Sequence, residues 1–239
     1  MAVKTSEKPL NTLCIDVGGT GVKIMILDAQ GKPLTERLRT PTPVNPTPAR
    51  VLAAVEKLKA QVPKFDRVSV GFPGVVKHGI IYTAVNLHPK WVEFRLQSEL
   101  EKRWKKPVRV ANDAAVQGYA AIRGKGVEMI LTLGTGLGSA IYTEGHLCPG
   151  LELAHHPWIK DKTYEDFLGK RGLKKHGAKR WNKLLAEAIQ QTASTFNWDK
   201  LYLGGGNAKE ISFKLGENIE VISNEDGLLG GAALWKHDF

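Results

Sequence analysis

Residues 13–27 read LCIDVGGTGVKIMIL, two apolar segments of strand length on either side of a glycine-rich turn. This pattern predicts a strand, a tight turn and a second strand. Residues 128–142, EMILTLGTGLGSAIY, repeat it in the second half of the chain. A single turn of this kind often only reverses the chain, but its repetition indicates two related lobes with a cleft between them.

Apolar strands alternate with amphipathic helices around these two hairpins. Further strands are expected at 34–39, 67–72, 108–111 and 200–203, and helices at 49–61, 93–104, 113–122, 178–195 and 227–235. Such alternation is typical of an α/β protein with mainly parallel central strands. We expect residues 1–112 to form an N-terminal α/β lobe, completed by the C-terminal helix near 227–236, and residues 113–239 to form the C-terminal lobe.

Composition narrows the class of protein. The 239 residues are 42% hydrophobic and 24% charged, as in ordinary soluble proteins. No apolar run reaches the roughly 20 residues of a membrane span, and the N-terminus has no signal-peptide core, so we expect a cytoplasmic protein. The net charge of +10 indicates a polyanionic partner, either nucleic acid, a membrane surface or polyphosphate, unless it is only a solvated basic surface.

Three glycine clusters are candidates for phosphate binding. Glycine lets backbone N–H groups approach an anion, and a threonine adds a hydroxyl. The candidates are Gly18, Gly19, Thr20 and Gly21, then Gly134, Thr135 and Gly136, then Gly204 and Gly205. No cluster ends in the Gly-Lys-Ser/Thr of a P-loop, and none matches the dinucleotide fingerprint between a strand and a helix.

Asp113 is the candidate general base. It lies in Ala111-Asn112-Asp113-Ala114, where an apolar strand gives way to a helix of small residues. A carboxylate in this position can accept a proton from a reacting hydroxyl. The alternative is a carboxylate that only caps the helix N-terminus.

Four motifs occur in a particular order and spacing along nearly the whole chain. They are Asp16 to Lys23, Ala111 to Ala114, Leu133 to Gly138, and Leu203 to Gly206. In this order they resemble the ROK sugar kinases of the actin-like ATPase superfamily. The resemblance implies the two-lobed, ribonuclease H-like fold of that superfamily, with substrates in the central cleft.

Other stretches resemble the polyphosphate glucokinase branch of that family. They are 71–76, 83–86, 136–140 and 164–169. Typical ATP-dependent members carry a cysteine-rich zinc motif, whereas this chain has only Cys14 and Cys148. No zinc site is therefore expected.

The resemblance also implies residue roles. Asp113 matches the base that deprotonates the sugar 6-hydroxyl. The matched sugar contacts are Asn86, Asn112, Glu152 and His155, with Glu165 either a further contact or a surface charge. Ala154 stands where the family usually has glycine. If that position needs a positive φ, alanine would strain the turn and shift His155.

Two further positions match the phosphate side of the cleft. Asp16 matches the carboxylate that orients Mg²⁺, through water, since this ion prefers oxygen ligands and retains water. Lys23 matches a basic position near the phosphates, or else lies on the exposed face of the hairpin. The cofactors implied are Mg²⁺ and a phosphate donor, polyphosphate or ATP.

A basic segment without acids runs from Lys170 to Lys183. Its candidates for a polyphosphate path are Lys170, Arg171, Lys174, Lys175, Lys179 and Arg180. A row of such charges can hold a chain of phosphates with strong salt dependence. The alternative is a solubilising helix face.

Three functions fit these patterns. The first is a kinase that transfers phosphate from polyphosphate to the 6-hydroxyl of glucose, with no nucleic-acid or membrane partner and, as is common in the family, as a homodimer. The second is an ATP-dependent hexokinase of the same fold. The third is a sugar-responsive transcriptional regulator, which is less favoured because only about ten residues precede the first strand.

Overall fold

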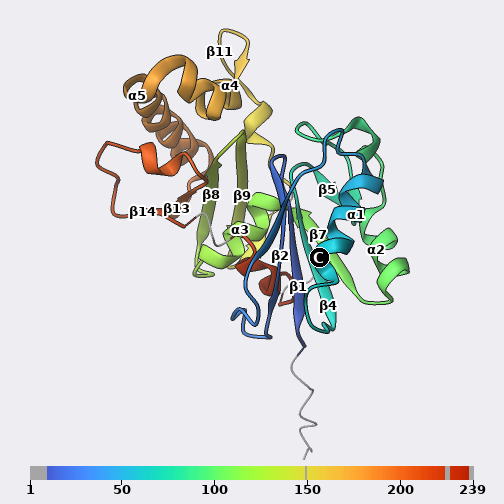
Figure 1. Cartoon of the computed structure of the whole chain (residues 1–239). Coiled ribbons are helices and arrows are strands. Elements are labelled where there is room, and N and C mark those ends of the chain that lie inside the picture. Colours follow the sequence, from blue (N-terminus) through green and yellow to red (C-terminus); the bar gives the residue numbers. More distant parts are fainter. Residues whose placement is uncertain (1–9, 149, 224–226, 237–239) are drawn as a thin grey trace, which may run out of the picture.

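The computed structural model describes residues 10–148, 150–223 and 227–236. Residues 1–9, where the sequence has no signal-peptide core, lie outside this described part. The chain forms two five-stranded sheets with helices around and between them (Figure 1). None of the helices in the described part combines the length and apolar character that a membrane crossing needs.

The first sheet has the order β3-β2-β1-β4-β7. Its strands are β1 (Thr12–Val17), β2 (Gly21–Leu27), β3 (Leu38–Pro41), β4 (Arg67–Phe72) and β7 (Val108–Asn112). The second sheet has the order β10-β9-β8-β13-β14. Its strands are β8 (Val127–Leu133), β9 (Leu137–Thr143), β10 (His146–Leu147), β13 (Lys200–Gly204) and β14 (Ile219–Val221).

The two sheets share one topology. In each, the first two strands form an antiparallel hairpin, β1 with β2 and β8 with β9. The first strand of each hairpin then pairs in parallel with the next central strand, β4 or β13, and a further parallel strand follows. Hence the repeated glycine turn in the sequence marks a repeated architecture, as predicted.

Helices α1 (Pro48–Lys59) and α2 (Leu96–Trp104) lie on the side of the first sheet away from the second, and α5 (Lys170–Phe196) lies on the far side of the second sheet (Figure 1). Each helix buries an apolar face against its sheet. On α1 the buried face is Val51, Leu52, Val55 and Leu58, the face expected from the helical spacing. Two main cores result, one for each sheet.

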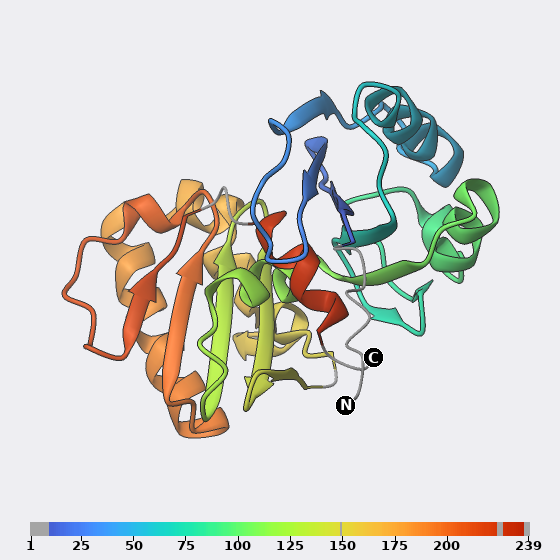
Figure 2. The ribbon, with the colours of Figure 1, turned by 90° about the horizontal axis from the view of Figure 1, so that it is seen from below.

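Helix α3 (Asp113–Ala121) lies between the sheets and contacts β4 and β7 of the first and β8 and β9 of the second (Figure 1). Its buried side chains are small at Ala114, Ala115 and Gly118, so both sheets can pack closely against it. Figure 2 shows the 3-10 helix η4 (Leu229–Trp235), in red, between the two sheets. Because α3 starts directly after β7, its first residue stands where the two halves meet.

Short elements complete the described chain. They are β5 (Val76–Lys77), β6 (Ile80–Ile81), β11 (Pro157–Ile159), β12 (Lys162–Thr163), α4 (Tyr164–Leu168), η1 (Pro89–Trp91), η2 (Leu153–His155) and η3 (Ala208–Glu210). Of these, α4, η2 and η3 border the site described below.

Four sequence-based boundaries are wrong. The third strand begins at Leu38 instead of 34, and α2 begins at Leu96 instead of 93, after Glu93 with a φ of 63° and Arg95 at the N-cap. Helix α5 begins at Lys170, so the basic segment itself is helical, with one break at Gly177 (φ 73°). The closing helix near 227–236 is a 3-10 helix over Leu229–Trp235.

Helix η4 is held against the first sheet by Trp235. The indole Nε1 donates a hydrogen bond to Ser69 Oγ at 2.8 Å. The guanidinium groups of Arg67 and Arg109 lie 5.0 Å and 4.7 Å from its ring centroid, within the range of cation–π attraction. These contacts support our proposal that the C-terminal segment completes the N-terminal lobe.

Candidate active site

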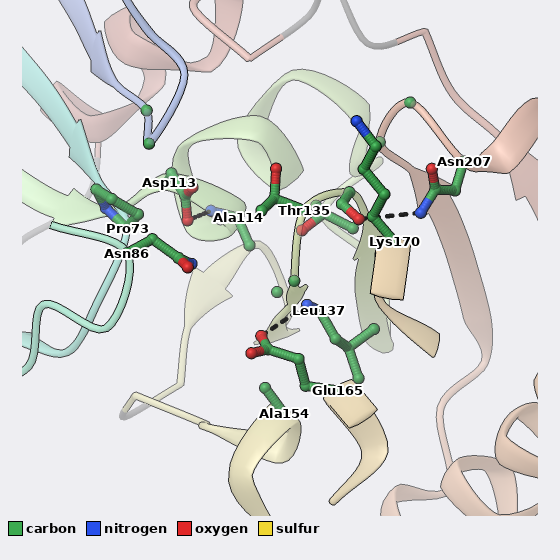
Figure 3. Close-up of a pocket in the computed structure, with 18 of the residues that line it drawn as sticks. Pro73, Asn86, Asp113, Ala114, Thr135, Leu137, Ala154, Glu165, Lys170 and Asn207 are labelled. Carbon is green, nitrogen blue, oxygen red and sulfur yellow. Dashed lines mark hydrogen bonds between the residues drawn. The ribbon is translucent and has the colours of Figure 1, made fainter. Parts of the chain in front are cut away.

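A cavity of about 910 Å³ opens between the two sheets (Figure 3). The strand–turn–strand units of both sheets and the first turn of α3 contribute to its wall. The predicted site residues that line it are Asp16, Gly18, Gly19, Thr20, Lys23, Asn86, Asn112, Asp113, Gly134, Thr135, Gly136, Glu152, His155, Glu165, Lys170, Lys174 and Gly205. The structure therefore brings together residues up to 189 positions apart, from Asp16 to Gly205.

Six predicted residues do not line the cavity. Gly21 packs under Arg39, whose Nε would lie 2.7 Å from an added Cβ, and Gly204 packs against Gln117 in the same way at 2.8 Å. The other four, Arg171, Lys175, Lys179 and Arg180, are exposed positions of α5 outside the cavity wall. The structure thus separates Lys170 and Lys174 from the rest of the basic segment.

Each glycine turn is closed by a backbone hydrogen bond, but the first turn is one residue longer than the second. Gly18 N–H donates to Gly21 O at 3.0 Å in the first turn, and Gly134 N–H donates to Gly136 O at 3.0 Å in the second. The third glycine cluster lies beside the second turn, where Gly205 has a φ of 85° and an added Cβ would lie 2.4 Å from Leu133 O. Only glycine fits this position without strain.

Asn112, not Asp113, caps helix α3. Its Oδ1 accepts hydrogen bonds from the N–H groups of Ala114 (2.9 Å) and Ala115 (3.3 Å), and its Nδ2 donates to Gly74 O at 3.2 Å. This network leaves one N–H of the Asn112 amide for the predicted sugar contact. Since Asn112 carries the capping function, the carboxylate of Asp113 is available to the cavity.

The environment of Asp113 suits a base that works near neutral pH. Its Oδ1 accepts a hydrogen bond from Ala114 N–H at 2.8 Å, which favours the charged form. Desolvation by the surrounding protein opposes this, as do the negative charges of Asp16 and Glu152. Together they raise the pKa of Asp113 to about 7. A base with this pKa is half ionised at neutral pH and holds an abstracted proton well.

Glu152 and His155 lie on a second wall of the cavity, on and beside η2 (Leu153–His155). Burial raises the pKa of Glu152, the nearby Glu165 raises it further, and His155, whose Nε2 lies 3.9 Å from Glu152 Oε2, lowers it. Ala154 between them is buried and does not have a positive φ. The strain considered from the sequence is therefore absent, and His155 keeps its place in the cavity.

Glu165 reaches the second glycine turn. Its Oε2 accepts a hydrogen bond from Leu137 N–H at 3.1 Å (Figure 3). A Cβ added to Gly136 would lie 2.1 Å from the same oxygen. Glu165 is thus half-buried inside the site and is not a surface charge.

Lys23 lies beside Asp16 in the cavity wall. Its Nζ is 2.7 Å from Asp16 Oδ2, in a partly buried ion pair. Lys23 is therefore neutralised by a protein carboxylate. The exposed-hairpin alternative is wrong for this residue, because it lines the cavity.

Among the polar groups of the cavity wall that sequence reasoning missed are Gln117, Asn207 and Lys209. Gln117 is buried one helical turn after Asp113, a spacing that puts both on one face of α3. Asn207 Nδ2 donates to Gly134 O at 2.9 Å and ties the third glycine cluster to the second turn. Helical spacing could have identified Gln117, whereas nothing local marks the other two.

The donor set also bears on metal binding. In the described residues, no group of three or more His, Cys, Asp or Glu side chains could hold a metal ion. Asp16 and Asp113 nevertheless line the same cavity, and the charge of Asp16 acts on Asp113. Two carboxylates beside glycine turns that are predicted to hold phosphate fit Mg²⁺, which keeps several waters and shares its coordination with substrate phosphates.

Comparisons with known proteins agree with this geometry. The sequence profile of the ROK family matches residues 12–157. A polyphosphate glucokinase of Mycobacterium tuberculosis (strain CDC 1551 / Oshkosh) is 28% identical, over 96% of this chain and 90% of its own. The crystal structure of the inorganic polyphosphate/ATP-glucomannokinase from Arthrobacter sp. strain KM has a TM-score of 0.84 at 32% identity, covering 97% of this chain and 100% of that one.

A second solved structure shares the fold. It is a ROK family glucokinase from Streptomyces griseus in complex with glucose and AMPPNP, with a TM-score of 0.75 at 22% identity, over 94% of this chain and 98% of that one. The expected two-lobed, actin-like ATPase fold is thereby confirmed, as is the resemblance found from the four motifs.

Proposed function

This chain belongs to the ROK family and is a sugar kinase, and we propose that it transfers the terminal phosphate of polyphosphate to the 6-hydroxyl of glucose. The observation that carries the proposal is one cavity that contains a carboxylate with a pKa of about 7, two glycine turns, and Lys170 and Lys174, which form no ion pair within the described part of the chain. Such a cavity has a base for a hydroxyl and a cationic place for a phosphate chain.

Asp113 acts as the general base in this proposal. As the glucose 6-oxygen attacks the terminal phosphorus, its proton passes to the Asp113 carboxylate, and the bond to the bridging oxygen of the donor breaks. The products are glucose 6-phosphate and a polyphosphate shorter by one unit. Hydrogen bonds between the other sugar hydroxyls and Asn86, Glu152 and His155 would hold the sugar in place, with the Glu152 carboxylate as an acceptor and with Asn112 and Glu165 as further contacts.

The backbone N–H groups of the two turns approach the transferred phosphate from both halves. Gly18, Gly19 and Thr20 belong to one turn, and Thr135 and Gly136 to the other. Mg²⁺ beside Asp16 would neutralise the charge of the phosphates when bound. Lys170 and Lys174 hold later units of the donor, because they line the cavity one helical turn apart on α5.

ATP is the second candidate donor. Gly205, Gly206 and Asn207 line the cavity beside the second turn, where a nucleoside would lie if its phosphates occupied the turns. The Arthrobacter relative is described as a polyphosphate/ATP enzyme, so one cavity of this type can serve both donors. We also propose a homodimer, which light scattering of the purified protein would test.

The test is a donor comparison. Purified protein with glucose and Mg²⁺ is given long-chain polyphosphate or ATP, and glucose 6-phosphate is measured. Product with polyphosphate supports the proposal. Product with ATP alone would select the second donor, and no product with either would refute glucose as the acceptor, with mannose as the next sugar to assay.

A further inference from the structure

Lys209 lines the same cavity as Lys170 and Lys174, but it comes from a different element. Lys209 lies on η3 (Ala208–Glu210), directly after the third glycine cluster, whereas the other two lie on α5. Lys170 N–H and Asn207 Nδ2 both donate to Gly134 O, so two separate segments of the second half each bring lysine side chains to the end of the cleft beside the second glycine turn. This juxtaposition cannot be read from the sequence, where 35 positions separate Lys174 from Lys209.

Helix η3 is fixed to α5 by a buried asparagine. Asn182 Nδ2 donates to Glu210 O at 2.8 Å, and Asn182 Oδ1 accepts from Ser212 N–H at 2.8 Å. Asn182 is 6% exposed, so both hydrogen bonds are shielded from water and favourable. The backbone that carries Lys209 thus keeps one position relative to the backbone that carries Lys174.

None of these three lysines forms an ion pair with another described residue. Lys23, at the opposite side of the cavity, is in contrast paired with Asp16 at 2.7 Å. Three like charges that share a cavity repel one another, and this repulsion is relieved when an anion binds between them. Glu210, which also lines this end of the cavity, would repel the same anion.

We propose that Lys209 forms the second wall of an extended polyanion site, opposite Lys170 and Lys174, which holds the units of a condensed phosphate beyond the one transferred. The inference rests on the proposed function and extends it, since it assigns a residue to the donor chain. A nucleotide would present a neutral nucleoside to this end of the cleft, whereas polyphosphate presents a charge on every unit. Lys209 therefore favours polyphosphate over a nucleotide.

Charge variants test this inference. Lys209→Glu should raise the KM for long-chain polyphosphate about tenfold and flatten the dependence of log KM on log salt concentration. Glu210→Gln should lower the same KM about two- to threefold, because it removes the repulsion. Lys214→Glu is the matched control, since Lys214 is exposed, close in sequence and outside the cavity wall, and should change neither quantity.

Opposite effects at neighbouring positions distinguish a charge effect from misfolding, which would weaken donor use in both variants. A KM for Lys209→Glu equal to that of Lys214→Glu would overturn the inference, as would a Glu210→Gln variant that binds more weakly than the wild type.

Direct binding separates this inference from the proposed function. Long-chain polyphosphate is titrated without glucose into the wild type and the same three variants. If the wild type binds polyphosphate through Lys209 but transfers no phosphate, the proposed function fails and the polyanion site stands. If the wild type transfers phosphate but Lys209→Glu binds as tightly, the function stands and the site is refuted; no binding by the wild type refutes both.

Discussion

Glu165 Oε2 accepts a hydrogen bond from the backbone N–H of Leu137 at 3.1 Å, which ties α4 to the second glycine turn. Leu137 is the first residue of β9, directly after the turn of Gly134 to Gly136. The same carboxylate lies near enough to Glu152 to raise its pKa. One side chain thus connects the wall assigned to the sugar with the turn assigned to the phosphate.

This connection predicts a graded effect of substitution at Glu165. Glu165→Ala leaves the Leu137 N–H without its acceptor, so we expect kcat to fall about tenfold or more and the KM for both substrates to rise. Glu165→Gln keeps a carbonyl oxygen in place and should retain most of kcat. Steady-state kinetics with each substrate varied would test this. If Glu165→Ala raised only the KM for glucose and left kcat unchanged, Glu165 would be a sugar contact and nothing more.

The pKa of Asp113, about 7, predicts the pH dependence of catalysis. The base must be ionised, so kcat/KM should rise with pH to a plateau above neutrality and fall about tenfold per pH unit on the acid side. Asp113→Asn should reduce kcat by a factor on the order of 10² to 10⁴. A profile that is flat from pH 5.5 to 8.5 would contradict the assignment.

The same group predicts how stability depends on pH. The pKa of Asp113 is raised from 3.8 in the unfolded chain to about 7 in the fold, so the folded state binds the proton more tightly. The cost of the buried charge is absent well below pH 3.8, grows as the pH rises from 3.8 to 7, and is complete only above pH 7. Asp113→Asn should therefore increase the free energy of unfolding at pH 8 by about 2 kcal/mol, and by much less at pH 4.5. Urea denaturation at both pH values measures the difference.

The ion pair between Lys23 and Asp16 predicts how the acid limb of the pH profile of kcat/KM shifts when Lys23 is replaced. The charge of Asp16 raises the pKa of Asp113, and Lys23 neutralises Asp16 at 2.7 Å. Lys23→Met should therefore move the acid limb of kcat/KM to higher pH, whereas Lys57→Met, on the exposed face of α1, should leave it in place. If the limb stays and only the donor KM rises, Lys23 contacts the phosphates instead.

Replacing Ala154 with glycine should destabilise the fold, whereas it would stabilise the fold if Ala154 were strained. It lies in the 3-10 helix Leu153–His155 without a positive φ. Glycine at such a position increases the conformational freedom of the unfolded chain, so Ala154→Gly should lower the free energy of unfolding by roughly 0.5–1 kcal/mol. A stabilised variant in urea denaturation would show that the alanine is strained after all.

Much of the fold was predictable because its signals are local. The two apolar segments in residues 13–27 and the glycine turn that follows Val17 indicated the first hairpin, and residues 128–142 indicated its repeat. Boundaries failed where one residue adopts a conformation that its type does not announce. Glu93 with a φ of 63° is such a case. At Gly177 the positive φ is ordinary for glycine, but nothing local shows that α5 continues across it.

The site shows the same division. Glycine turns, the carboxylate of Asp113 and the acid-free basic segment are visible as residue types in order, because backbone conformation and charge are properties of a short stretch. The sequence by itself therefore determined which chemistry the chain contains: a base, phosphate-binding turns and an excess of cations.

Only the tertiary structure decided which of these groups meet. It assigned the cap of α3 to Asn112 and left Asp113 to the cavity, paired Lys23 with Asp16, and admitted only two of the six basic candidates of α5. It also brought Lys209 to the same cavity. The physical reason is that ion pairing, desolvation and shared cavities depend on distances between segments far apart in the chain, and packing of the two sheets around α3 sets those distances.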